Sequence, residues 1–260
     1  MADKVRIFLD AGHGGYDSGA VYKGRKESDD NLKLVLAIGK ELVRNYSNVV
    51  VGYARKTDIF ESVTKKAQDS NDFKADYFFS FHRNSADDPE ANGWETLYKT
   101  INEFKVTFME DIADEMREFG YRLRPDKKRD DLGVLNRTDA FALLFETGFI
   151  TSQKDNKIFD AKFNAIVEAF VRVIAKNCGL VPKTSEKEIA PGDYNSMVQT
   201  TKKCPIRKGR GTAYKKLGTL KKGDKVKVLY ISKNKAGNLW GSIDYGDNVG
   251  YIYMKNVKAI

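Results

Sequence analysis

The sequence of 260 residues contains only two cysteines and no long apolar run. Cys178 and Cys204 are too few for a disulfide framework and match no metal-binding spacing, so both are expected to be free thiols. No apolar stretch approaches the roughly 20 residues that a membrane span needs. The N-terminus, MADKVRIFLDAG, lacks the roughly 7–15 apolar residues of a secretory signal peptide, so synthesis in the cytoplasm without membrane insertion is expected.

Nucleotide-binding signatures are also missing. No GK[ST] phosphate-binding motif occurs, and in the stretch GHGGYDSG the residue Asp17 stands where a dinucleotide fingerprint needs its third glycine. Hydrophobic residues make up 41% of the chain and aromatic residues 12%, which indicates a folded protein rather than a disordered one. The length suits one large core, or one medium domain with a small one.

Acidic residues are scarce in the last third of the chain. Residues 183–260 hold 17 lysines and arginines against 6 acidic residues, whereas residues 1–182 hold 28 against 30. This asymmetry favours two modules with different partners. A basic module is suited to a polyanion, such as nucleic acid, anionic lipid or an anionic wall polymer, unless the charge serves solubility alone.

A linker separates the two modules. The stretch VPKTSEKEIAPGDYN, residues 181–195, has two prolines, mixed charge and few large apolar residues. The sequence therefore predicts a first domain of residues 1–181, a linker of residues 182–192 and a second domain of residues 193–260.

Strand and helix patterns alternate before the linker. Four nearly continuous apolar runs, at residues 5–10, 48–54, 76–82 and 141–147, are typical of strands buried on both faces. Amphipathic helices are predicted at residues 31–46, with Val35, Leu42 and Val43 on the buried face, and at residues 103–120 and 158–179. The expected fold class is α/β, with a mostly parallel twisted sheet flanked by helices.

The pattern changes after the linker. Residues 225–232 and 249–254 alternate or run apolar, and Gly-, Asn- and Asp-rich turns separate such segments. Several short strands with turns of this kind predict a small all-β barrel.

The two histidines of the chain share a sequence context. His13 follows the first predicted strand, His82 closes the third, and Glu146 lies at the end of the fourth. Ligands of an open parallel sheet bind outside the carboxyl ends of its strands, so all three side chains are expected at one edge. Two imidazoles and a carboxylate suit a catalytic zinc ion with an open fourth position.

The residues leave two questions open. The third zinc ligand could be Asp10, Asp17, Glu27 or Asp58. Glu146, inside an apolar strand, needs a metal, a cation or a catalytic role, because an unpaired buried carboxylate is unfavourable. The alternative for Glu146 is an ion pair with Arg137 or a lysine.

Five ordered blocks across residues 5–178 resemble the zinc-dependent N-acetylmuramoyl-L-alanine amidases of the third amidase class. The blocks are FLDAGHGGYDSGA, GRKESDDNL, ARKTD, ADYFFSFHRNS and LLFETGFITSQKD. The resemblance implies that His13, Glu27 and His82 ligate Zn²⁺ and that Glu146 is the catalytic carboxylate. It also implies the substrate, the amide that joins N-acetylmuramic acid to L-alanine in peptidoglycan.

The basic tail resembles bacterial SH3-like wall-binding modules, with peptidoglycan and cell-wall polymers as the expected partners. It departs from them in CPIRKGRG, where such modules usually have a valine-arginine-serine-glycine run. An amidase with a wall-binding tail and no signal peptide resembles a phage endolysin of a Gram-positive host, which acts on the wall after the membrane has been permeabilised.

Other functions remain as alternatives. One is a bacterial autolysin or sporulation-related amidase, and another is a zinc peptidase that cuts within the stem peptide. A nucleic-acid-binding protein is not expected, because the basic tail lacks the fingers or helices of a base-reading module.

Overall fold

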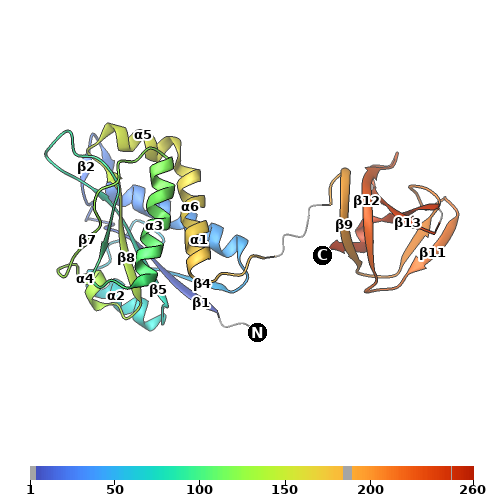
Figure 1. Cartoon of the computed structure of the whole chain (residues 1–260), viewed down its shortest axis with the longest axis horizontal. Coiled ribbons are helices and arrows are strands. Elements are labelled where there is room, and N and C mark those ends of the chain that lie inside the picture. The colour runs from blue at the N-terminus through green and yellow to red at the C-terminus, as the bar shows by residue number, and fades with distance from the viewer. Residues whose placement is uncertain (1–3, 184–188, 247) are drawn as a thin grey trace. The chain divides into compact units, whose positions relative to one another are not determined.

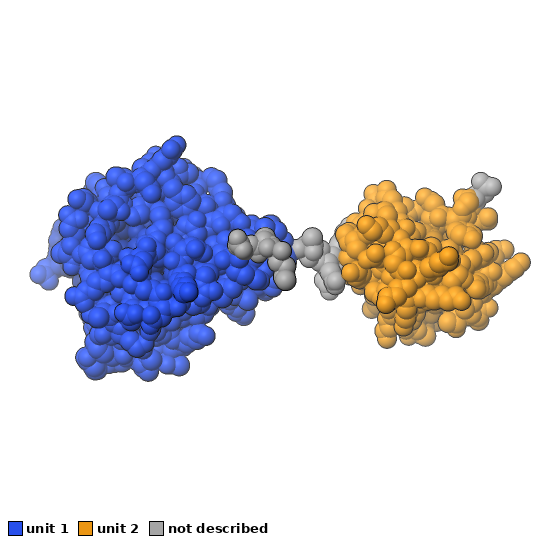
Figure 2. Space-filling view, turned by 90° about the horizontal axis from the view of Figure 1, so that it is seen from below, with its two compact units in different colours: residues 1–183 blue, residues 184–260 orange. Residues whose placement is uncertain are grey.

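The computed structural model of the chain describes residues 4–183, 189–246 and 248–260. It divides into two compact units, Met1–Lys183 (unit 1) and Thr184–Ile260 (unit 2), which Figure 2 colours blue and orange. Within the predicted linker, residues 184–188 lie outside the described part. Lys183 still belongs to unit 1, because its backbone N–H donates to Asn45 O at 2.7 Å. Separate folding of the two predicted domains remains a proposal.

A six-stranded sheet in the order β4-β1-β5-β8-β6-β7 forms the centre of unit 1. Its first four members, β4 (Val49–Tyr53), β1 (Val5–Ala11), β5 (Tyr77–Asn84) and β8 (Phe141–Phe149), are parallel. β6 (Glu95–Tyr98) pairs antiparallel with β8 and parallel with the short β7 (Lys127–Lys128). The predicted mostly parallel sheet is therefore confirmed.

Helices cover both faces of this sheet (Figure 1). The larger core joins Phe79 and Leu143 of the sheet to α1 (Glu27–Asn45), α3 (Glu103–Glu118) and α6 (Phe163–Asn177). The smaller core, on the other face, joins Phe78 and Leu144 to α4 (Gly133–Arg137), which packs against α2 (Val63–Asp72). Successive residues of one strand pack into opposite cores, because successive side chains point to opposite faces of the sheet.

The helix predictions need two corrections. Val35 and Leu42 of α1 are buried as expected, but Val43 is 48% exposed. The single helix predicted at residues 158–179 is broken at Lys162 into α5 (Gln153–Ala161) and α6. Phe159 of α5 lies beneath the Arg83 guanidinium, whereas α6 packs against α1 and α3, so the break lets the two helices serve different surfaces.

Unit 2 is an antiparallel all-β unit, as predicted. Its seven-stranded sheet has the order β11-β10-β14-β13-β12-β9-β15. The bounds are Gly192–Thr200 (β9), Cys204–Arg207 (β10), Lys216–Leu220 (β11), Lys225–Lys233 (β12), Leu239–Tyr245 (β13), Asn248–Tyr253 (β14) and Val257–Ala259 (β15). The predicted linker thus runs into β9 at Gly192. Both cysteines are free and buried, and no helix among the described residues is long and apolar enough to cross a membrane.

Candidate metal centre

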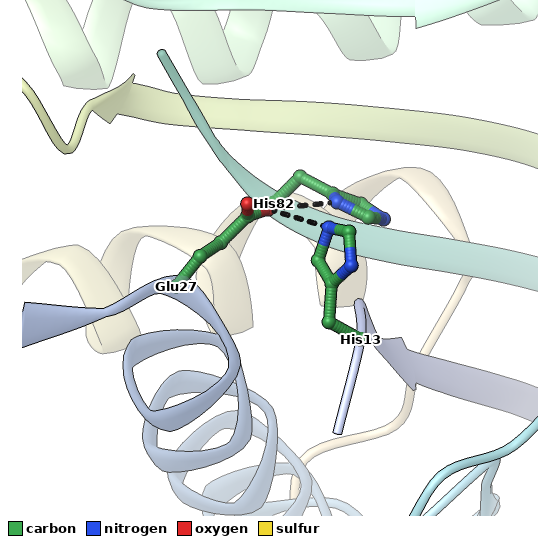
Figure 3. A group of neighbouring side chains, drawn as sticks. All are labelled: His13, Glu27 and His82. Carbon is green, nitrogen blue, oxygen red and sulfur yellow. Dashed lines mark hydrogen bonds and ion pairs between the residues drawn. The ribbon is translucent and has the colours of Figure 1, made fainter. Parts of the chain in front are cut away.

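Three side chains from separate elements meet at the carboxyl edge of the unit 1 sheet. His13 follows β1, Glu27 is the first residue of α1, and His82 lies in β5. One ligand atom from each lies within 4.8 Å of the others, and Figure 3 shows the three side chains pointing toward one another. Glu27 Oε1 is 3.2 Å from His13 Nε2 and 2.9 Å from His82 Nδ1. The structure therefore brings together the two histidines and one of the four candidate carboxylates.

Pairing of β1 with β5 brings the two histidines together. Ala11 and Phe81 are Cα partners in this parallel pair, and the Gly12 N–H donates to Phe81 O at 3.0 Å. Both strands run toward the same edge, so His13, two residues after the end of β1, lies beside His82 near the end of β5. The two imidazole rings stand edge to face, with centroids 5.0 Å apart.

Backbone and side-chain donors hold the Glu27 carboxylate in place. Oε2 accepts a hydrogen bond from Ala20 N at 3.0 Å, while Oε1 accepts one from Arg83 N at 3.0 Å and one from Asn31 Nδ2 at 3.3 Å. Burial raises the pKa of Glu27, but hydrogen bonds and charge attraction from both histidines outweigh burial and hold this pKa far below its ordinary value. Glu27 is consequently an ionised carboxylate, the form that binds a metal.

Asp17 fixes the orientation of the His13 ring. His13 Nδ1 lies 2.9 Å from Asp17 Oδ2, and Asp17 Oδ1 also accepts the Gly19 N–H at 3.0 Å. With Nδ1 donating to this carboxylate, Nε2 is left to face Glu27, which is the arrangement found around metal-bound imidazoles. Burial lowers the pKa of His13, but contacts with Glu27 and Asp17 outweigh burial and raise it to about 9.

The glycines around His13 give room to the ligand side chains. A Cβ added to Gly12 would lie 2.2 Å from His82 Cε1. A Cβ on Gly19, where φ is +63°, would lie 2.6 Å from both Glu27 Oε2 and His13 Cδ2. Any side chain at these two positions would displace the cluster, so Gly12 and Gly19 are packed against His13, Glu27 and His82.

The remaining candidate carboxylates have other partners. Asp10 is fully buried, pairs with Lys66 Nζ at 2.8 Å and accepts a hydrogen bond from Ser80 Oγ at 2.7 Å. Asp58 accepts the Gly15 N–H at 2.8 Å. Neither belongs to the cluster of ligand atoms, nor does Asp17.

Glu146 lies beside this cluster on β8. It is the Cα partner of His82 on one side and of Glu95 on the other. Glu146, His13 and His82 line the same cavity of about 600 Å³. Glu146 Oε2 is enclosed and has no hydrogen-bond partner among the described residues. Burial raises the pKa of Glu146 to about 7, with Glu27 and Glu95 adding to the rise and both histidines opposing it.

The alternative role for Glu146, an ion pair, does not fit the structure. Arg137 donates instead to the Thr64 hydroxyl, and no lysine or arginine of the described ranges forms an ion pair with Glu146. Oε2 is therefore a buried carboxyl oxygen without a partner among the described residues, on a side chain that lines the cavity.

A buried network behind the cluster was not apparent from the sequence. The Arg83 side chain is fully buried and donates to Asp30 Oδ2 at 2.6 Å and to Asn156 Oδ1 at 2.7 Å. Arg25 Nε donates to the same Asp30 oxygen at 2.7 Å and pairs with Asp160. Because Arg83 follows His82 and Asp30 lies one turn after Glu27, the network ties the elements that carry His82 and Glu27 together.

The donor set fits zinc. Two imidazoles and one carboxylate form a known ligand set of catalytic zinc sites, in which the fourth position is left for water or substrate. Each of the three groups is held by hydrogen bonds away from the cluster or by close packing, and Glu146 lies in the cavity onto which the site opens.

Comparison with known proteins places both units. Residues 7–176 match the family described as N-acetylmuramoyl-L-alanine amidase, and residues 205–258 match the bacterial SH3 domain. The amidase CwlM of Bacillus licheniformis is 32% identical over 170 residues, which is 65% of this chain and 65% of CwlM. The endolysin of Bacillus phage SPP1 is 32% identical over 197 residues, 70% of this chain and 71% of the endolysin.

A solved structure agrees with these matches. The catalytic domain of the amidase CwlV from Bacillus (Paenibacillus) polymyxa superposes with a TM-score of 0.63 at 26% identity, covering 68% of this chain and 99% of that domain. The mostly parallel sheet that carries the site and the match over residues 7–176 lead to the same result. The chain belongs to the N-acetylmuramoyl-L-alanine amidase family and carries a bacterial SH3 domain after its amidase unit.

Proposed function

We propose that this protein is a zinc-dependent N-acetylmuramoyl-L-alanine amidase that hydrolyses the amide between N-acetylmuramic acid and L-alanine in peptidoglycan. The observation that carries the proposal is the convergence of His13, Glu27 and His82 beside Glu146, whose Oε2 has no hydrogen-bond partner among the described residues. Family membership supports the reaction, and the names of the relatives supply the bond.

His13, Glu27 and His82 would hold the zinc ion. A zinc ion in such a site lowers the pKa of a bound water to about 7 and polarises a carbonyl group. Neighbouring groups would orient these side chains for the ion. Asp17 fixes the His13 ring, and the N–H groups of Ala20 and Arg83 fix the Glu27 carboxylate.

Glu146 would move the proton. A carboxylate whose pKa lies near 7 can accept a proton from the attacking water and return it to the leaving L-alanine amine. Glu146 Oε2 accepts no hydrogen bond from the described residues, so it is not engaged by another donor before these steps.

The rest of the cavity suits a peptide attached to a sugar. Its lining includes the apolar side chains of Phe60, Val63, Leu132 and Val134, together with Arg129, which pairs with Asp131. A mainly apolar cleft with a few polar groups is the usual form of an organic ligand site.

We infer that the protein lyses bacteria as a phage endolysin, acting on the wall once the membrane has been permeabilised. The SPP1 endolysin supports this setting. The sporulation-specific amidase of Bacillus subtilis, 32% identical over 161 residues, supports the alternative of a bacterial amidase. In both settings unit 2 would bind the wall and keep the amidase unit on its substrate.

Mass spectrometry of digested walls tests the reaction. The proposed cleavage releases intact stem peptides with a free L-alanine amine and leaves the glycan strands whole. A zinc peptidase would release fragments cut inside the stem peptide, and that product would contradict the proposal.

A further inference from the structure

Basic residues far outnumber acidic residues in one stretch of unit 2. Residues 202–235 hold 13 lysines and arginines but a single acidic residue, Asp224. The Asp224 carboxylate is used by the backbone, since its Oδ2 accepts the Lys221 N–H at 2.7 Å. In unit 1, by contrast, cations such as Arg172 and Lys176 pair with carboxylates. No ion pair joins two described residues of unit 2, so the positive charge of residues 202–235 has no described acidic partner.

The loop between β10 and β11 gathers part of this charge. Lys208, Arg210 and Lys215 of the loop are exposed, as is Lys216 at the start of β11, and the loop contains no acidic residue. It starts in the stretch CPIRKGRG, where the sequence departs from the run usual in SH3-like modules. We therefore expect unit 2 to bind a different partner through this loop than other SH3-like modules do.

The loop has a defined shape. Lys208 N donates to Lys215 O at 2.9 Å, and Arg207 Nη1 donates to Tyr214 O at 2.8 Å. The Tyr214 ring packs on Gly209, where an added Cβ would lie 2.5 Å from the ring, and the tyrosine is still 54% exposed. The loop thus presents an aromatic ring among four cations.

A second turn lies next to this loop. A Cβ added to Gly211 would lie 4.0 Å from Asn234 Nδ2, so the turn after β12 is a neighbour of the loop. Lys233 and Lys235 of this turn are exposed. We define the basic loop surface as these two lysines with Lys208, Arg210, Tyr214, Lys215 and Lys216.

We propose that the basic loop surface binds an anionic phosphodiester polymer of the bacterial cell wall, made of sugars or polyols joined through phosphates. Repeated phosphates would meet the unpaired lysine and arginine side chains, and arginine can bind phosphate oxygens in a bidentate manner. The exposed Tyr214 ring would pack against a sugar or polyol unit between phosphates. The location of this polymer in the wall rests on the proposed function.

Nucleic acid is the less favoured partner. Unspecific single-strand binding uses a basic groove with several aromatic platforms, whereas this surface offers one exposed ring. The described residues of unit 2 also form no α-helix that could enter a DNA groove, and their one helical segment is the short 3₁₀ turn Met254–Asn256.

Cosedimentation with purified Gram-positive walls tests the proposal. The full chain carries Glu146→Gln so that the walls are not digested during the assay. Hydrofluoric acid cleaves phosphodiesters and leaves peptidoglycan behind, so extracted walls should bind the chain at least about tenfold more weakly, because each exposed charge pair contributes up to a few-fold. Unchanged binding after extraction would overturn the proposal.

Two variants with the same net charge test whether wall binding depends on the basic loop surface or only on the total positive charge of unit 2. The first variant should bind walls about tenfold more weakly, or weaker still, at ~0.15 M salt. It combines the substitutions Lys208→Gln, Arg210→Gln, Lys215→Gln and Lys216→Gln. The control changes Lys202, Lys203, Lys221 and Lys222 to Gln, removes the same number of exposed charges elsewhere in unit 2, and should change binding less than about threefold. Equal losses would contradict the assignment to the loop.

Competition identifies the class of polymer. The phosphodiester polymer released from walls should displace the chain at a lower phosphate concentration than duplex DNA. More effective competition by DNA would replace the proposal with nucleic-acid binding. The L-alanine amine released by the wild-type chain is measured separately. A wild-type chain that binds the polymer but releases no amine would contradict the proposed amidase function without contradicting this inference.

Discussion

His82 and Glu146 are Cα partners across the parallel strands β5 and β8, so an imidazole and a carboxyl group line the same cavity at the carboxyl edge of the sheet. The imidazole belongs to the cluster of three ligand atoms, whereas Glu146 does not. In the proposed function the two residues have different roles, His82 in holding zinc and Glu146 in moving a proton.

Glu146→Gln should separate these roles. The amide keeps the shape of the side chain but cannot take up a proton, and general acid–base groups typically contribute about 10²–10⁴-fold in rate. We expect zinc near one equivalent per chain, a Tm close to that of the parent, and activity lower by that factor. Elemental analysis and turnover on purified walls give the two values. Loss of zinc together with activity would make Glu146 a ligand.

Glu27 and Asp17 should differ in their effect on zinc. Glu27→Ala removes a ligand atom, so zinc should be lost on dialysis against metal-free buffer. Asp17→Ala removes only the carboxylate that orients His13 and should retain zinc with an affinity about 10–100-fold lower. Zinc titration with a competing chelator measures both. If Asp17→Ala is emptied and Glu27→Ala stays loaded, the choice of carboxylate is wrong.

The carboxyl edge of the sheet was predictable because it depends only on strand direction. His13, His82 and Glu146 each follow or end an apolar run, and parallel strands bring such residues together. Glu27 could not be chosen from the residues alone. Its approach to His82 depends on where α1 begins and on the loop that carries Ala20, and only the family resemblance indicated it.

Other features depend on contacts that a sequence pattern does not encode. Arg83 and Asp30 are 53 positions apart and meet only because α1 lies against the end of β5. Val43 fits the apolar spacing of α1 but lies outside the area that the sheet and α6 cover. The break at Lys162 follows the different surfaces packed by α5 and α6, whereas the apolar spacing continues across it.

Asp30 should be important for stability. Asp30→Ala leaves the fully buried Arg83 guanidinium without its carboxylate, and breaking a buried pair costs about 3–5 kcal/mol. Asp160→Ala is the matched control, because Asp160 is an acidic partner of Arg25 and its own side chain is 60% exposed. Its loss should lower the free energy of unfolding by less than about 1 kcal/mol. Urea unfolding of both variants compares the two free energies. Similar small losses would show that Arg83 does not depend on Asp30.

The two units should be separable. Residues 1–183 include the last described hydrogen bonds of unit 1, from Val181 N to Asn48 Oδ1 and from Lys183 N to Asn45 O. This fragment should fold, bind zinc and release alanine amine, but more slowly on intact walls. Residues 189–260 should sediment with walls. A first fragment that fails to unfold cooperatively, or a second that stays in the supernatant, would contradict the proposed division.

The most direct test of the zinc centre is the rate of L-alanine amine release from purified walls by the metal-depleted protein, before and after zinc is added. Because His13, Glu27 and His82 would hold an ion that the reaction requires, the depleted protein should be inactive and one equivalent of zinc should restore the rate. Full activity of a protein shown by elemental analysis to contain no metal would contradict the account.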